Sequence, residues 1–252
     1  MAALQLNEKL VEPGPKEEAL FLAIAANDSG KIRQAVRNGA SLTTPVHGLP
    51  PLFQALRYPA IFNLLRRLGA PIKGVDPYGR TLLHYLASDS MVLSITEPKT
   101  GDVFRDYANG LVSGPVDVLR PLEARRKLAE DLIKHGIDLE AKDFAGRTAL
   151  HYAVQAWDWH AVAMLLRITE WPRLVAPGHF VRKNDPDPFA RRSPYFPDID
   201  AEDFKCQTPL ISLVRESGLF GRSDHDVIVV GLLLEAGADP ARKDHTGLTA
   251  EG

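Results

Sequence analysis

The sequence predicts an all-α repeat protein in which pairs of short helices stack one after another along the chain. The main observation is a repeated phrase: DPYGRTLLHYLA at 76–87 returns as DFAGRTALHYAV at 143–154. Weaker copies stand at 48–56, 206–214 and 244–252. A second phrase, an apolar run that ends on glycine, occurs at 35–42, 65–72, 132–139 and 233–240. Recurrence of two phrases in alternation is typical of stacked repeat units.

The first phrase reads as a turn followed by the start of a helix. Asp76 and Gly79 suit a tight turn, because aspartate bonds nearby backbone amides and glycine tolerates a positive φ. Thr81 then stands where it can cap the helix that follows. Pro51 and Pro209 occupy the first helical position of other copies, where a missing N–H group costs nothing.

The second phrase reads as the end of a helix. Gly39, Gly69, Gly136 and Gly237 each follow an apolar run, where a left-handed residue ends a helix most readily. Each unit is therefore expected to hold one turn and two helices. One such unit cannot bury its apolar stripe alone, which explains why the phrase is repeated.

The succession D-x-x-G-x-T-P-L-H-x-A, followed by a second helix that ends on L-L-x-x-G-A-D, resembles the ankyrin repeat of about 33 residues. This resemblance implies a solenoid of helix-turn-helix units with projecting finger turns. We expect an N-terminal extension at 1–16 and a repeat domain at 17–252, with about five repeats and a terminal fragment.

Two spacings between copies are nearly twice the others, and we interpret the excess as insertions at 88–124 and 169–200. The first insertion is expected between the helices of the third unit, whose second helix should run roughly over 126–135. It could be a packed surface loop, or it could form a short helix around Val103, Phe104, Tyr107 and Leu111.

The second insertion is expected to replace the Gly-Ala-Asp ending of the fourth unit. It is rich in proline, and Arg191 and Arg192 stand among aromatic residues. Exposed aromatics beside arginine are typical of protein contact surfaces. We predict a folded flap that leaves both arginines accessible to an acidic partner or ligand; a simple long loop is the alternative.

Composition excludes several classes of function. A net charge of −2, with lysine and arginine spread along the chain, gives no basic face for nucleic acid or membrane. The lone Cys206 cannot form an internal disulfide, and no long apolar run suggests a span, so an intracellular protein, cytoplasmic or nuclear, is expected. No cofactor or metal is expected, because the histidines and the cysteine lack ligand spacing.

His84 and His151 occupy the histidine slot of the ankyrin-like phrase. The resemblance implies a structural imidazole that bonds neighbouring turns, and Phe53 and Ile211 fill the same slot elsewhere. No catalytic motif occurs, so no catalytic residue is assigned. The alternative is an enzyme whose pocket lies between the insertions and the repeat groove.

The leading hypothesis is a non-enzymatic scaffold that binds another protein through its concave groove, its finger turns and the second insertion. A stack fixes its core positions and leaves finger tips free to vary, and here the variable positions are aromatic and basic. The candidate residues are Tyr78, Arg80, Phe144, Arg147, Phe204 and Lys205 in the fingers, and Arg57, Tyr58, Gln155 and Trp157 at helix ends. The alternative for Phe144 and Phe204 is that they pack against adjacent fingers.

The C-terminal edge is expected to carry an apolar surface. The run DVIVVGLLLEAG before it is apolar on nearly all sides, with Ile228 and Gly231 at positions that are usually charged. We expect the apolar surface of such a helix to be buried by another segment or molecule. The cover could be further repeats of a longer chain, a second copy of the protein, or the first insertion or the tail folding back.

Overall fold

The computed structural model describes residues 14–88, 115–166, 197–217 and 224–250. Within these ranges the chain is helical, with turns between the helices and no strand beyond one isolated bridge, Val46 to Leu49. The chain divides into two compact units, Met1–Pro77 and Tyr78–Gly252.

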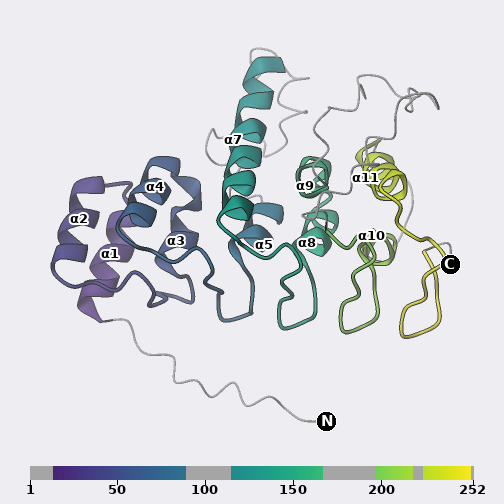
Figure 1. Cartoon of the computed structure of the whole chain (residues 1–252), viewed down its shortest axis with the longest axis horizontal. Helices are drawn as coiled ribbons and strands as arrows, with labels where there is room; N and C mark the ends of the chain where they lie inside the picture. The colour runs from purple at the N-terminus through teal and green to yellow at the C-terminus, as the bar shows by residue number, and fades with distance from the viewer. Residues whose placement is uncertain (1–13, 89–114, 167–196, 218–223, 251–252) are drawn as a thin grey trace, which may run out of the picture. The chain divides into compact units, whose positions relative to one another are not determined.

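The first unit contains two helix pairs (Figure 1). Helix α1 (Pro15–Ala25) packs against α2 (Ser29–Arg37). Helix α3 (Pro51–Gln54) continues into the 3-10 turn η1 (Ala55–Arg57) and packs against α4 (Pro59–Arg67). Helix α3 also contacts α1, so the two pairs of this unit stack.

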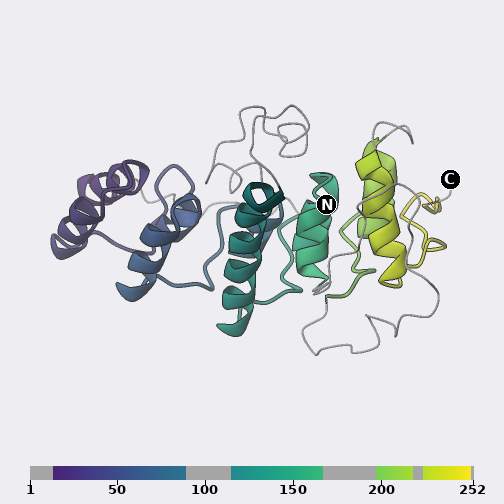
Figure 2. The same ribbon diagram turned by 90° about the horizontal axis from the view of Figure 1, so that it is seen from above.

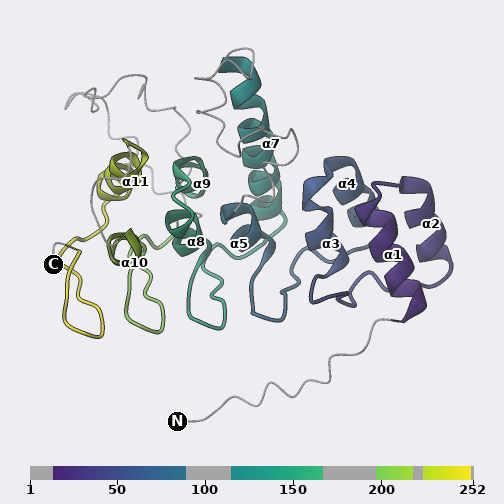
Figure 3. The same ribbon diagram turned by 180° about the vertical axis from the view of Figure 1, so that it is seen from behind.

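The second unit repeats the arrangement with longer connections. Its helices are α5 (Leu82–Ala87), α7 (Pro115–Lys134), α8 (Ala149–Gln155), α9 (Trp159–Leu165), α10 (Pro209–Ser217) and α11 (Asp224–Glu235). Helices α5, α8 and α10 contact one another in succession and form an inner row. Helices α7, α9 and α11 form an outer row (Figures 1 and 2). Extended turns hang below the inner row in the view from behind as well (Figure 3).

The core of the second unit lies between these rows. It is made of leucine, alanine and valine side chains that are at most 2% exposed, among them Leu82, Leu83, Leu86, Leu132, Leu150 and Leu165. Alanine at the inner positions, such as Ala153, lets neighbouring helices approach closely. Each pair is therefore stabilised mainly by the pair beside it, as expected of a repeat stack.

The local signals for helix ends are confirmed. Thr81 and Thr148 form capping boxes at the starts of α5 and α8. The predicted terminating glycines Gly39, Gly69, Gly136 and Gly237 all have positive φ, between 78° and 99°.

The predicted start of the second helix in the third unit is wrong. We expected this helix at 126–135, but α7 begins at Pro115, inside the predicted first insertion. Pro115 suits the first helical position, and the Leu-, Ala-, Glu- and Arg-rich run that follows favours helix over loop. The possible short helix near Val103 lies outside the described residues.

The end of the second insertion also differs from the prediction. We expected the insertion to replace the Gly-Ala-Asp turn, but Asp198 supplies that turn by accepting a bond from the N–H of Asp200 at 3.1 Å. Asp138 and Asp239 do the same for Glu140 and Ala241. The repeat geometry thus resumes before residue 200, because an Asx turn needs only one aspartate in the right place.

Cys206 gives a test of the turn geometry. It has φ of 55°, at the position that glycine holds in the other turns: Gly79, Gly146 and Gly247 have φ of 80° to 81°. We expect Cys206→Gly to raise the free energy of unfolding by about 0.5–1 kcal/mol. The strain energy that glycine relieves in the folded state should exceed the entropic cost of ordering the more flexible glycine on folding. Urea unfolding measures this change.

The matched control is Gly146→Ala at the equivalent position. A Cβ there would lie 2.7 Å from the ring of Phe204 and 2.8 Å from its backbone nitrogen. This variant should lose about 2 kcal/mol or more. A Cys206→Gly protein less stable than wild type would contradict the account.

Candidate partner-binding surface

The projecting turns of the second unit are joined by backbone hydrogen bonds, and we call them fingers: residues 143–147, 203–207 and 244–248. The N–H of Phe144 donates to the carbonyl of Tyr78 at 2.9 Å, and the N–H of Phe204 donates to Ala145 at 3.0 Å. The N–H of His245 donates to Lys205 at 3.1 Å. Each finger is therefore held by the segment before it.

An aspartate inside each finger accepts its backbone amides. The Oδ1 atom of Asp143 accepts from the N–H groups of Ala145 and Arg147, both at 2.8 Å. Asp203 and Asp244 serve their own fingers in the same way. The hydroxyl of Thr246 is the main cause that lowers the pKa of Asp244 to about 2. The pKa of Asp143 is lowered as well, so these two buried carboxylates are charged and turned inward.

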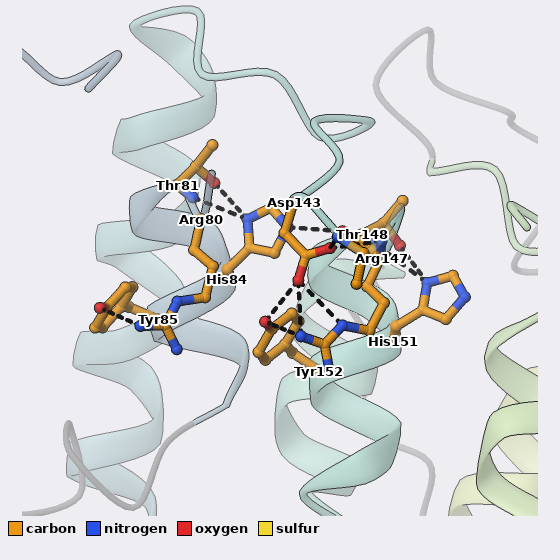
Figure 4. A network of polar contacts seen from close by, with 10 residues as sticks. Arg80, Thr81, His84, Tyr85, Asp143, Arg147, Thr148, His151 and Tyr152 are labelled. Carbon is orange, nitrogen blue, oxygen red and sulfur yellow. Dashed lines mark hydrogen bonds and ion pairs between the residues drawn. The ribbon is translucent and has the colours of Figure 1, made fainter. Parts of the chain in front are cut away.

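Two imidazoles fasten the inner helices to the next finger (Figure 4). The Nδ1 atom of His84 accepts from the N–H of Thr81 at 3.0 Å, and its Nε2 bonds the carbonyl of Arg147 at 3.0 Å. His151 repeats this arrangement with the N–H of Thr148 and the carbonyl of Gln207. The predicted structural role of both histidines is confirmed.

Three aromatic side chains stand exposed on this edge. Tyr78, Phe144 and Phe204 are 65%, 63% and 75% exposed. A glycine in the preceding turn makes room for each phenylalanine ring. A Cβ on Gly79 would lie 2.8 Å from the ring of Phe144, and one on Gly146 would lie 2.7 Å from the ring of Phe204. Phe144 and Phe204 therefore pack against the adjacent turn, as the alternative interpretation predicted, and are exposed to solvent as well.

Arg80 and Arg147 hold tyrosines of the inner helices (Figure 4). The guanidinium of Arg147 donates twice to Oδ2 of Asp143, at 3.0 and 2.8 Å, and also to the hydroxyl of Tyr152 at 2.7 Å. Arg80 donates to the hydroxyl of Tyr85 at 2.8 Å and lies over the rings of Tyr78 and Tyr85. Both arginines thus have intrachain partners, which sequence alone did not indicate.

Burial acts against the charge of Asp143, but the Arg147 amide, the Tyr152 hydroxyl and the Arg147 guanidinium outweigh it and lower the pKa of this carboxyl. Burial and the Asp143 bond together raise the pKa of Tyr152 to about 12. The cluster therefore keeps a carboxylate, a guanidinium and a neutral phenol at neutral pH.

The other candidate residues occupy different places. Trp157 and Gln155 lie half-buried at the end of α8, and Lys205 is exposed in its finger. Arg57 lies in η1 and Tyr58 precedes α4, with its hydroxyl 3.4 Å from the carbonyl of Ala25. Both belong to the first unit. Arg191 and Arg192 fall outside the described residues.

A buried ion pair behind the inner row was not anticipated. Arg125 of α7 is 2% exposed and bonds the carbonyl of Leu86 and the Oδ2 atom of Asp158, the latter at 2.5 Å. Burial opposes ionisation of Asp158, but the charge of Arg125 outweighs it and lowers the pKa of that carboxyl. The pair ties α7 to the end of α5 and to the start of α9.

In the described part of the chain, no group of three or more His, Cys, Asp or Glu side chains is arranged to hold a metal ion. The same ranges contain no helix with the length and apolar character needed to cross a membrane.

Comparison with known proteins agrees with this geometry. No protein-family model matches the chain. The NF-kappa-B inhibitor alpha of Gallus gallus is 30% identical over 102 residues, 39% of this chain and 32% of that protein. The phosphocholine transferase AnkX of Legionella pneumophila is 22% identical over 218 residues, 81% of this chain and 22% of that protein.

Fingers, capping boxes with histidine, and stacked helix pairs occur together in a chain that matches these two proteins. The chain resembles ankyrin repeat proteins. It spans less than a third of the length of both relatives. The division of the chain into about five repeats over 17–252, with insertions that begin at 88 and 169, is a proposal; the first insertion ends before Pro115 and the second before Asp198.

His151 gives a pH test of the finger contacts. Burial lowers its pKa, so the unfolded state takes up a proton near the ordinary histidine value of about 6.5 while the folded state does not. Stability should therefore fall as pH drops below that value. We expect the free energy of unfolding in urea to be lower at about pH 5.5 than at about pH 7.5 in wild type. This decrease should be smaller by roughly 1 kcal/mol in His151→Gln.

Titration of the acidic groups does not account for a difference between wild type and His151→Gln. Asp143 and Asp158 have lowered pKa values, so their contribution is lost only at lower pH. Burial raises the pKa of Glu140 and Asp200, which favours the folded state on acidification in both proteins equally. An equal loss in wild type and His151→Gln would refute the role given to this imidazole.

Proposed function

We propose that this ankyrin-like repeat protein is a non-enzymatic scaffold that binds another protein through its finger turns, the exposed ends of its inner helices and the second insertion. Relatives built from ankyrin repeats are typically protein-binding. The observation that carries the proposal is the succession of exposed aromatic rings at Tyr78, Phe144 and Phe204, each ring more than 60% exposed. Fixed aromatic side chains bind partners with little loss of rotamer freedom.

Trp157 supports the proposal independently. Its backbone has φ of 55°, a left-handed conformation that is unfavourable for a bulky residue. The equivalent turn between α1 and α2 places Asn27 there, with φ of 52°. The left-handed backbone itself closes α8, because the N–H of Trp157 donates to Val154 and that of Asp158 donates to Ala153. A bulky side chain at a position that suits asparagine or glycine suggests a role in binding.

The names of the relatives point to different functions. One is called an inhibitor of NF-kappa-B, a name that fits binding to another protein. The other is called a phosphocholine transferase, and the chain spans 22% of it. The alternative of an enzyme with a pocket between the insertions depends on residues outside the described ranges, and no observation on the described residues favours it.

Trp157→Asn separates binding from folding. We expect this variant to be more stable than wild type by roughly 1 kcal/mol, because asparagine tolerates left-handed backbone. Its affinity for a partner identified by affinity purification and mass spectrometry should fall about tenfold or more. Isothermal titration with that partner, alongside urea unfolding, measures both effects.

The matched control is Leu234→Ala, which removes a 44% exposed apolar side chain from α11. This control should bind the partner as wild type does. If Trp157→Asn and Phe204→Ala both bind with wild-type affinity while folded, the proposed binding surface is wrong.

A further inference from the structure

We propose that the finger edge of the second unit binds an extended acidic peptide segment of a partner protein. The finger edge comprises Tyr78, the three fingers, and Lys142 and Lys243 beside them. This inference rests on the proposed function and adds the chemistry of the partner.

The acidic side chains of the fingers are turned away from a partner. Asp143 and Asp244 are 4% and 5% exposed, and Oδ1 of each accepts backbone amides of its own finger. Asp203 accepts the N–H groups of Lys205 and Gln207 at 2.7 and 2.9 Å. Arg147 and Arg215 pair with Asp143 and Asp244 and further neutralise them.

The basic side chains of the same segments point the other way. One exposed lysine accompanies each finger: Lys142 precedes the first finger, Lys205 lies within the second, and Lys243 precedes the third. The ammonium of Lys142 donates to the carbonyl of Glu202, a neutral acceptor, at 2.7 Å. None of these lysines forms an ion pair with a carboxylate of the described residues. The exposed charged side chains of the finger edge are therefore lysines, although the whole chain has a net charge of −2.

The arrangement suits an extended chain. Backbone bonds from Phe144 to Tyr78, from Phe204 to Ala145 and from His245 to Lys205 fix the order of the fingers along one edge. An exposed phenylalanine recurs on successive fingers with a lysine near it. A partner segment with alternating apolar and acidic side chains can contact a phenylalanine ring and an ammonium at each of the first two fingers.

Nucleic acid is the competing class, because single strands also stack on aromatics beside lysine. The turns that lead into the fingers disfavour it. Asp138, Glu140, Asp198 and Asp239 are all exposed there. A polyphosphate that follows the fingers would bring a charge at every nucleotide past these carboxylates, whereas a peptide in which acidic side chains alternate with apolar ones brings fewer charges near them.

Fluorescence anisotropy with defined probes tests the proposal. The main probe is a fluorescein-labelled, proline-containing peptide of about twelve residues, in which Glu alternates with Leu and Phe, long enough to pass several fingers at about 3.3 Å per residue. The comparison probes replace every Glu by Gln or by Lys, and a single-stranded oligouridine serves as the nucleic acid. The full chain is used throughout.

The acidic peptide should bind at least about tenfold more tightly than the Gln and Lys peptides and the oligouridine, and added salt should weaken it. Phe204→Ala and Lys205→Gln should each weaken binding about fivefold or more. Lys134→Gln, which removes an exposed lysine at the end of α7, is the matched control and should leave the affinity unchanged.

The other outcomes overturn the proposal in distinguishable ways. Equal affinity for acidic and neutral peptides, lost in Phe204→Ala, would reject the acidic partner and keep the protein-binding function. Tighter binding of oligouridine would assign the edge to nucleic acid. If no probe binds, the acidic segment is rejected, and the identified partner of the Trp157→Asn experiment decides whether the protein-binding function still stands.

Discussion

The fingers 143–147 and 203–207 depend on a hydrogen bond that the preceding inner helix, α5 or α8, makes to the finger after it. His84 and His151 accept the N–H of their own capping threonine and bond a carbonyl in the next finger. One imidazole thus fixes both the start of a helix and the position of a neighbouring turn. The backbone bonds between fingers and the placement of Phe144 and Phe204 over the preceding glycines follow from that position.

This construction separates stability from recognition. Buried leucines and alanines, the imidazoles and the inward aspartates hold the stack, so the exposed ring and lysine positions can vary without loss of the core. The residue types least suited to their backbone conformation in this unit are Trp157 and Cys206, which both have left-handed φ values. Trp157 lies at the end of an inner helix, where strain is consistent with a residue retained for contact with a partner.

Sequence predicted what depends on local chemistry. Threonine caps, proline at the first helical turn, and glycine at helix ends each act within a few residues, so their patterns specified the helix boundaries and the repeat. The start of α7 was missed because its residues favour helix without any repeat signal. The Arg125–Asp158 pair and the bonds of Arg80 and Arg147 join residues through the tertiary fold. No pattern in the chain indicates such contacts.

The central claim is that the imidazole bond orders the next finger. Hydrogen exchange of the Phe204 amide tests it most directly, because this N–H donates to Ala145 in the preceding finger while His151 bonds Gln207 at the base of its own. We predict slow exchange at Phe204 in wild type and markedly faster exchange in His151→Ala, with the amide of Phe144 less affected. Unchanged protection of Phe204 in a folded His151→Ala protein would contradict the account.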